Sequence, residues 1–384
     1  MKEETLYHDA VSNAIRAKKT YLQKALREEY LFEYESLTRD FHISDAQYES
    51  EVKPFWRQYG LSPEKYWFEM AGSRDGVIDP LFIPDDLYFC DLIPYLNNLQ
   101  FWRATADKGY YDILFPDVNR PRTVCRCMAG LCYDAGMNMI SRDRAMDLIL
   151  HEQGSLVIKQ SIYSEFGKGI AVFAPSALSR EQVEEIVTSA GTNYVVQEKV
   201  EEHPTLKKIA EGGATTIRVM SMLTEDGVYI PYLVLRVNPL DATFISCEHR
   251  GYAVAIRDDD TLVPKILYDS IADTNGRYIN PMQWKDAPAS FRENAGPLPG
   301  MDRIREQVRR MHPRLPHFRW LGWDFMVDKT GEAVFIEFNT APGCFRSQTA
   351  SCVPFFGDMT EWVLDDYFNK RTLENNQRQG LLVQ

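Results

Sequence analysis

The stretch WDFMVDKTGEAVFIEFN, from Trp323 to Asn339, has the pattern of two β-strands joined by a turn. If KTGE is the loop of this hairpin, Asp324 lies directly across from Glu337, and Asn339 lies on the same face. The other face is then expected to be a continuous apolar wall made of Trp323, Phe325, Val327, Val334, Ile336 and Phe338. The hairpin should therefore bury one face and gather polar groups on the other.

The polar face of this hairpin needs a counter-charge, because two carboxylates that face each other repel. Asp324, Glu337 and Asn339 all offer oxygen atoms, which are the ligands that Mg²⁺, or Mn²⁺ in its place, prefers. Two alternatives stay open. An arginine from elsewhere in the chain pairs with one of the carboxylates, or the two carboxylates act as a general acid and base, which would leave Asn339 unexplained.

The composition is that of an ordinary globular protein. The chain has 384 residues, 45% of them hydrophobic, and a net charge of -12, so it offers no basic face for nucleic acid. No apolar run approaches the roughly 18 residues of a membrane span, and the first residues lack the apolar core of a secretory signal. We therefore expect a cytoplasmic protein, with Cys125, Cys127 and Cys132 as small buried side chains of a strand.

The order of elements predicts a three-part chain. Apolar spacing predicts a helix over residues 3–35, which would pack on the body or mediate a homodimer, and capping boxes begin helices at Ser44 and Ser179. Another helix should start at Ser62-Pro63. The proline-rich stretch LFPDVNRPR separates a helical region, 1–115, from an α+β segment, 116–200, and a second α+β part, 201–384.

Several basic residues in the second and third parts suit anions. Lys159 ends the apolar strand SLVIKQ and precedes the loop SEFGKG, whose Gly167, Lys168 and Gly169 can bring backbone N–H groups and an ammonium to phosphate oxygens. A hairpin connection and a surface lysine are the alternatives. Arg218 lies between Ile217 and Val219 in a half-buried strand, where a guanidinium suits phosphate or carboxylate, and Arg236 is either similar or exposed.

Taken in order, Lys159 with SEFGKG, VVQEKVEEHP, TTIRV and GWDFMVDKTGEAVFIEFNTAPG resemble the ATP-grasp superfamily, and within it the sugar-transfer-associated branch. The resemblance covers about residues 122–362. It implies an α+β fold in which ATP lies between two lobes. Lys159 would contact the α-phosphate, and Lys168 with its loop would cover the β- and γ-phosphates. Arg218 would face the transferring phosphoryl group, with Arg236 beside it as a second catalytic cation.

The resemblance also implies roles for other positions. Those on the adenine and ribose side would be Gln197, Glu198, Val200 and His203, and those holding two Mg²⁺ ions would be Asp324, Glu337 and Asn339. The lysine that many relatives place ahead of the small lobe is absent between Lys108 and Lys159, so Arg122 or Arg126 would replace it. Because FISCEHRGYAV departs from the family pattern, His249, Arg250 and Arg346 are only candidates for the substrate side, with a solvated loop as the alternative.

The chemistry that the resemblance implies is ADP-forming ligation of a small-molecule carboxylate to an amine through an acylphosphate, as in surface-glycan biosynthesis with a sugar acid as acceptor. Such a reaction needs no protein nucleophile. Two alternatives stay open, namely an ATP-dependent small-molecule kinase on the same scaffold and a nucleotide-binding module without chemistry.

Overall fold

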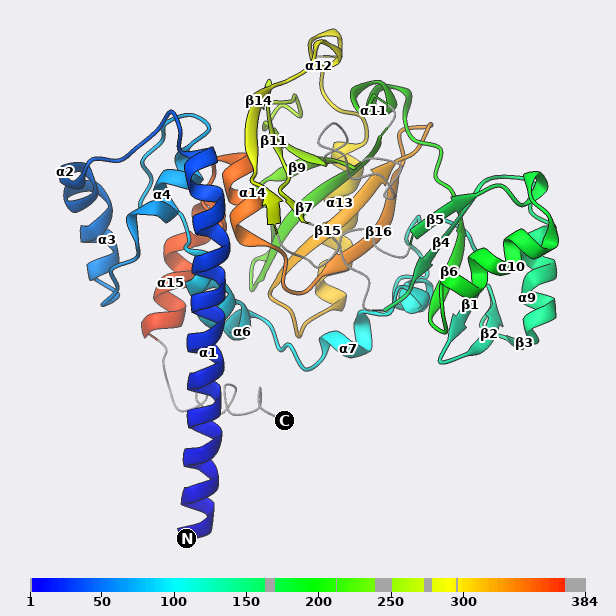
Figure 1. Ribbon diagram of the computed structural model, residues 1–384, viewed down its shortest axis with the longest axis horizontal. Helices are drawn as coiled ribbons and strands as arrows, with labels where there is room; N and C mark the ends of the chain where they lie inside the picture. Colours follow the sequence, from blue (N-terminus) through cyan, green and yellow to red (C-terminus); the bar gives the residue numbers. More distant parts are fainter. Residues whose placement is uncertain are drawn as a thin grey trace.

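The computed structural model describes residues 2–162, 170–211, 213–238, 251–272, 278–294 and 296–369 (Figure 1). A helical N-terminal region precedes two lobes that combine helices with antiparallel sheets, which confirms the predicted α+β class. Within the residues just given, no helix has both the length and the apolar character needed to span a bilayer.

The N-terminal region is built around one long helix, α1 (Lys2–Leu37), which confirms the helix predicted over residues 3–35. Its N-terminal half extends away from the sheets, and its second half packs on the body (Figure 1). The other helices of this region are α2 (Asp45–Gln47), α3 (Lys53–Arg57), α4 (Lys65–Gly72), α5 (Asp85–Leu87), α6 (Ile93–Leu96), α7 (Trp102–Thr105) and α8 (Tyr111–Leu114), with π-helical turns Tyr48–Val52 and Tyr88–Leu92 and the 3-10 turn Lys108–Tyr110.

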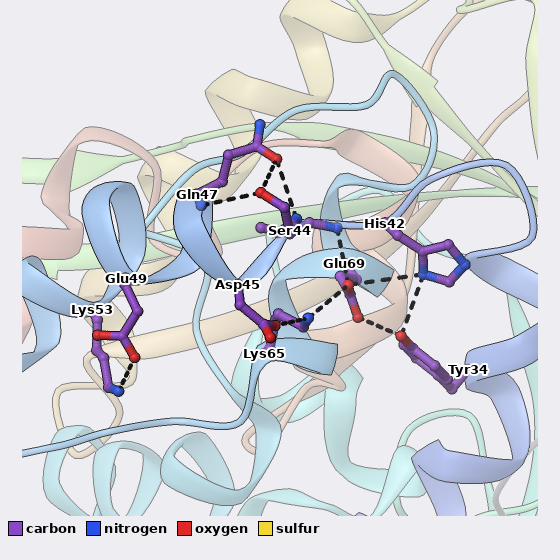
Figure 2. Close-up of polar contacts among 10 residues, drawn as sticks. Tyr34, His42, Ser44, Asp45, Gln47, Glu49, Lys53, Lys65 and Glu69 are labelled. Atoms are coloured by element: carbon purple, nitrogen blue, oxygen red, sulfur yellow. Dashed lines mark hydrogen bonds and ion pairs between the residues drawn. The ribbon is translucent and has the colours of Figure 1, made fainter.

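Buried carboxylates attach α1 to the short helices. The Glu69 side chain of α4 is 1% exposed and accepts hydrogen bonds from the Tyr34 hydroxyl at 2.5 Å and the Ile43 amide at 2.9 Å (Figure 2). The capping box predicted at Ser44 is present. The helix start predicted at Ser62-Pro63 is wrong by two residues, because the Pro63 carbonyl accepts the Tyr48 hydroxyl and α4 begins only after Glu64.

The smaller lobe combines an antiparallel sheet with helices that pack beside it (Figure 1). Its strands follow the order β3-β2-β1-β6-β4-β5. Their bounds are β1 (Thr123–Met128), β2 (Leu131–Asp134), β3 (Met139–Ile140), β4 (Leu156–Gln160), β5 (Ile170–Phe173) and β6 (Tyr194–Glu198), with α9 (Arg142–Leu150), the 3-10 turn Pro175–Ala177 and α10 (Arg180–Ser189). The capping box at Ser179 is present. Cys125, Cys127 and Cys132 are free thiols buried in this lobe, as predicted, but Cys132 lies on β2 and not on the strand β1 that carries the other two.

The larger lobe is a sheet whose strands follow the order β14-β11-β10-β9-β7-β15-β16, with β8 beside β7. The bounds are α11 (Pro204–Ile209), β7 (Ala214–Thr224), β8 (Gly227–Tyr229), β9 (Leu233–Asn238), β10 (Tyr252–Ile256), β11 (Lys265–Tyr268), β12 (Ile271–Ala272), β13 (Tyr278–Asn280), β14 (Gln283–Asp286), α12 (Ala289–Glu293), α13 (Met301–Met311), the 3-10 turn His312–Arg314, β15 (Trp320–Val327), β16 (Ala333–Asn339), α14 (Cys344–Ser351), the 3-10 turn Gly357–Met359 and α15 (Thr360–Asn369).

The two faces of the larger sheet have different partners. One face, with Val219 and Trp323, forms a core with α11 and α13. The opposite face carries Met220 and Trp320, which pack with the N-terminal helices, α14 and α15. Further along this second face the side chains become polar, beginning with Arg218. The N-terminal helices thus cover the apolar part of this sheet face, and the polar part lies beside them. The division at residues 115 and 200 stays a prediction.

The hairpin of β15 and β16 has the predicted pairing at its polar end and a different one near its turn. Asp324 pairs with Glu337 as predicted, but the next pair is Phe325 with Phe335, so Ile336 is an extra residue in a β-bulge. The predicted apolar wall is therefore wrong for Val334 and Ile336. Beyond the bulge the register shift turns Phe335 and Ala333 into the core beside Phe325 instead.

Candidate active site

Three neighbouring strands bring an arginine and two carboxylates into one row. The Cα partners across β7, β15 and β16 are Arg218 with Asp324 and Asp324 with Glu337. The guanidinium donates from Nε to Oδ1 of Asp324 at 2.6 Å and from Nη2 to Oδ2 at 2.9 Å. The arginine that pairs with Asp324 is thus Arg218, so one alternative left open by the sequence is present in the structure.

This buried ion pair is held in its charged form. Burial alone would raise the pKa of Asp324, but Arg218 outweighs it and the pKa is lowered. Burial would likewise lower the pKa of Arg218, yet Asp324 raises it above its ordinary value. A Cβ at Gly322 would lie 2.7 Å from the Pro342 Cβ and 3.4 Å from the Arg218 Cδ, so the glycine leaves room for the arginine beside the strand.

Two lysines face the Glu337 end of the row. The Lys108 ammonium lies 3.1 Å from Oε2 of Glu337, and its backbone N–H donates to the Ser161 carbonyl at 2.9 Å. Lys159 of β4 is 8% exposed. Burial lowers the pKa of Lys159 to about 8, Glu337 raises it and Lys108 lowers it. Glu337 thus lies in the field of both ammonium groups, and Lys159 forms no ion pair within the described residues.

Lys108 is the residue that sequence reasoning missed. It lies in a 3-10 turn that Arg126 holds, since this arginine donates to the Gly109 carbonyl and to both carboxylate oxygens of Asp112, at 2.7 and 2.5 Å. Arg126 is 0% exposed and its guanidinium supports the turn, so its predicted place beside the phosphates stays a prediction. The other suggested replacement, Arg122, is half exposed and pairs with Glu152 and Glu198.

The residues predicted for the adenine and ribose side lie at the end of β6 and just after it. Gln197 is 7% exposed, with its amide donating to the Pro121 carbonyl and the Thr123 hydroxyl, both at 3.4 Å. Glu198 is exposed and pairs with Arg122, and Val200 is half buried. His203 caps α11 by accepting the Thr205 amide at 3.2 Å, and its own backbone N–H donates to Val327 of β15. This segment therefore joins the two lobes.

Of the remaining predicted site residues, the structure describes Arg236 and Arg346. Arg236 of β9 lies on the same sheet face as Arg218, and Arg346 of α14 contacts Asp269 with Nε at 3.1 Å from Oδ1. Five of the predicted site residues lie outside the described residues, and these are Gly167, Lys168, Gly169, His249 and Arg250.

The predicted metal ligands are compatible with a hard cation by donor type. Asn339 donates its amide to Oδ2 of Asp324 at 3.5 Å, and each carboxylate keeps lone pairs beyond those used by Arg218 and Lys108. Across the ranges that the structure describes, no group of three or more His, Cys, Asp or Glu side chains is placed to hold a metal ion. A site here would therefore need Asn339 or a substrate oxygen to complete it.

Comparisons with known proteins give low-level likenesses only. No family model and no curated protein matches the chain. Among solved structures, VanG D-Ala:D-Ser ligase from Enterococcus faecalis matches with 14% identity and a TM-score of 0.40, covering 68% of this chain and 61% of that one. D-alanine–D-alanine ligase from Bacillus anthracis matches with 12% identity and a TM-score of 0.36, covering 69% of this chain and 67% of that one.

L-amino acid ligase from Bacillus licheniformis matches with 12% identity and a TM-score of 0.36, covering 74% of this chain and 51% of that one. The chain thus spans less than two thirds of the length of the first and third of these structures. At such TM-scores the likeness carries no argument about activity, which must rest on the residues of the site.

Proposed function

We propose that the protein is an ATP-dependent carboxylate–amine ligase of the ATP-grasp type. The observation that carries the proposal is the convergence of Lys108, Lys159 and the Arg218–Asp324 pair on Glu337, at the place where the two lobes meet. Buried cations in excess of their carboxylates are suited to a polyanion such as the triphosphate of ATP. The sequence motifs from Lys159 to Asn339 support the same proposal.

In the proposed reaction, a carboxylate oxygen of the substrate attacks the γ-phosphorus of ATP, and ADP leaves with the electrons of the broken P–O bond. The amine nitrogen of the second substrate then attacks the acyl carbon, phosphate leaves, and the nitrogen loses a proton to give the amide. No step uses a protein nucleophile. The chain's task is positioning and charge stabilisation, which is how phosphoryl-transfer enzymes obtain most of their rate.

Each charged residue has a distinct task in this scheme. Lys159 and Lys108 would hold phosphate oxygens, because contact with an anion offsets the cost of burying the Lys159 ammonium. Arg218 would face the transferring phosphoryl group, oriented by its bidentate contact with Asp324. Gln197, Glu198, Val200 and His203 would line the adenine and ribose side. Arg126 would act indirectly, by holding the turn that carries Lys108.

Asp324, Glu337 and Asn339 would hold the Mg²⁺ of Mg-ATP, with two ions, or Mn²⁺ in their place, as part of the proposal. When bound, the metal supplies positive charge against the phosphate oxygens. Until then Arg218 and Lys108 neutralise the same two carboxylates, so the row of strands stays balanced in charge. The finer substrate assignment, an amine joined to a sugar acid in surface-glycan biosynthesis, rests on the motif resemblance, and the cytoplasmic location rests on the charge and hydropathy of the sequence.

The test is release of ADP and phosphate from Mg-ATP across a matrix of carboxylates and amines that includes uronic acids and amino acids. Both products should appear only when a carboxylate and an amine are present together. ADP without free phosphate, with a single hydroxyl acceptor, would instead establish a kinase. Tight Mg-ATP binding with no turnover across the matrix would contradict the ligase for these substrates and favour a binding module.

A further inference from the structure

The chain that follows β16 turns back over the polar end of the hairpin. Asn339, the last residue of β16, pairs with Gly322 of β15, and residues 340–343 then lead into α14. Pro342 of this turn lies against Gly322, because a Cβ at the glycine would be 2.7 Å from the Pro342 Cβ and 3.4 Å from the Arg218 Cδ. The turn 340–343 is therefore packed beside the row of charged residues.

The first contact on this turn comes from Asn97, directly after α6. Its side chain is 1% exposed, and Nδ2 donates to the Thr340 carbonyl at 2.5 Å and to the Trp320 carbonyl at 2.7 Å. Its Oδ1 accepts the Trp320 N–H at 3.0 Å. One buried amide thus joins the residue that follows Asn339 to the first residue of β15, and a shift of either would leave buried polar atoms unpaired.

The second contact comes from Tyr88, in the π-helical turn Tyr88–Leu92. Tyr88 is 0% exposed, and its hydroxyl donates to the Pro342 carbonyl at 2.8 Å. Its ring packs edge-on against that of Phe355, with the centroids 4.8 Å apart, so the hydroxyl has a fixed place. The N-terminal region therefore holds the turn 340–343 at two of its carbonyl groups.

These contacts bear on Asn339 through its backbone. The side chain of Asn339 is only half buried, and its hydrogen bond to Oδ2 of Asp324 is long, at 3.5 Å. The backbone is fixed on both sides, by the pairing with Gly322 and by the contact of Asn97 with Thr340. If the turn left this arrangement for part of the time, the affinity of a ligand that needs Asn339 would fall in proportion to the time that the residue is in place.

We propose that Asn97 and Tyr88 are positioning residues, which hold Asn339 where it can bind the Mg²⁺ of Mg-ATP. The inference rests on the proposed function, because this cation is the one that Asp324, Glu337 and Asn339 would hold. It gives the N-terminal region a task in metal binding, and this task is exerted through the backbone of the turn 340–343 and not through a metal ligand.

The experiment measures the Kd of ATP for the full chain by calorimetry, once in EDTA and once in excess Mg²⁺. The ratio of the two Kd values reports what the cation adds, and the contribution of the lysines cancels. Tyr88→Phe removes one hydroxyl, so this ratio should fall about fivefold while the Kd in EDTA stays within about twofold of wild type. Asn97→Ala removes three hydrogen bonds and should lower the ratio further, and Tyr88→Phe carries the test if Asn97→Ala does not fold.

Tyr48→Phe is the matched control. The Tyr48 hydroxyl also donates to a proline carbonyl, that of Pro63, in the part of the N-terminal region between α2 and α4, which lies apart from β15 and β16 (Figure 1). This control should leave the ratio unchanged. Hydrogen exchange followed by mass spectrometry adds a readout without nucleotide, because peptides that cover residues 336–345 should exchange faster in Tyr88→Phe and at the wild-type rate in Tyr48→Phe.

The two proposals fail in different ways in this experiment. If wild type binds ATP in neither solution, the ligase proposal fails and the positioning role falls with it. Equal Kd values of wild type in the two solutions would remove the metal site and therefore this role. If Mg²⁺ strengthens binding and Tyr88→Phe keeps the full ratio, or Tyr48→Phe loses as much of it, the positioning role is overturned and the ligase proposal stands. A lower ratio in Tyr88→Phe alone, with faster exchange at residues 336–345, is the result that we expect.

Discussion

Replacing Lys159 by methionine should stabilise the protein and at the same time abolish Mg-ATP binding. The Lys159 side chain is 8% exposed, and burial lowers its pKa from the ordinary 10.5 to about 8. At about 1.4 kcal/mol per pKa unit, this depression corresponds to about 3 kcal/mol of unfolding free energy lost at neutral pH. Methionine has a similar length and no charge, so Lys159→Met should recover most of that amount.

The sign of this effect fixes its pH dependence. Below about pH 8 the lysine is charged in both the folded and the unfolded chain, and the full cost of burying the ammonium is present. Between about 8 and 10.5 the unfolded chain binds more protons than the folded one, so the stability contributed by this group rises with pH. The difference between wild type and variant should therefore be largest at pH 7 and close by about pH 10.5.

The assay is urea unfolding followed by circular dichroism at pH 7 to 10, with calorimetric Mg-ATP binding on the same samples. Lys329→Met is the control, because Lys329 is exposed and pairs with Glu201 on the surface. A Lys159→Met variant that binds Mg-ATP like wild type would refute the phosphate role. A variant destabilised by more than about 1 kcal/mol at pH 7 would refute the reasoning about the buried charge.

Three further predictions concern the other charges and α1. Glu337→Gln should abolish turnover, while Glu332→Gln in the adjacent turn should not; activity of Glu337→Gln within about tenfold of wild type, or 1.4 kcal/mol, would contradict the metal role. Arg126→Met should lower the unfolding free energy by about 3 kcal/mol or more, since it leaves the Asp112 carboxylate unpaired; unchanged stability with weaker Mg-ATP binding would instead make Arg126 a phosphate ligand. A homodimer held by α1 should become a monomer in light scattering when residues 1–18 are removed, and a folded truncation of unchanged stoichiometry would exclude it.

The sequence predicted those parts of the fold that local patterns determine. The hairpin was found from strand alternation and turn residues, and its Asp324–Glu337 pair is confirmed because turn position and side-chain period both constrain that register. The bulge at Ile336 was missed because its apolar neighbours fit either face equally well. The helices whose starts carry a capping box are confirmed for the same local reason, and only the start at Ser62-Pro63 was misplaced.

The charge partners of the site depend on long-range contacts and could not be predicted in the same way. Asp324 and Arg218 are 106 residues apart, and their pairing follows from the neighbourhood of β7 and β15. Lys108 lies in an unremarkable Lys-Gly turn, and only the packing of that turn on Arg126 brings its ammonium to Glu337. A lysine beside a glycine in a short turn before the first strand is a common pattern. Without the tertiary contacts it does not distinguish a lysine of a binding site from an ordinary surface lysine.

The central claim, activation of a carboxylate by phosphoryl transfer, is tested most directly by isotope transfer. The carboxylate that supports ADP release with an amine is labelled with ¹⁸O in both oxygens, and the phosphate released by the full chain is examined by mass spectrometry. The account predicts one ¹⁸O atom in each released phosphate, because the acylphosphate oxygen leaves with phosphorus. Phosphate that contains no ¹⁸O, formed while the amide product accumulates, would contradict it.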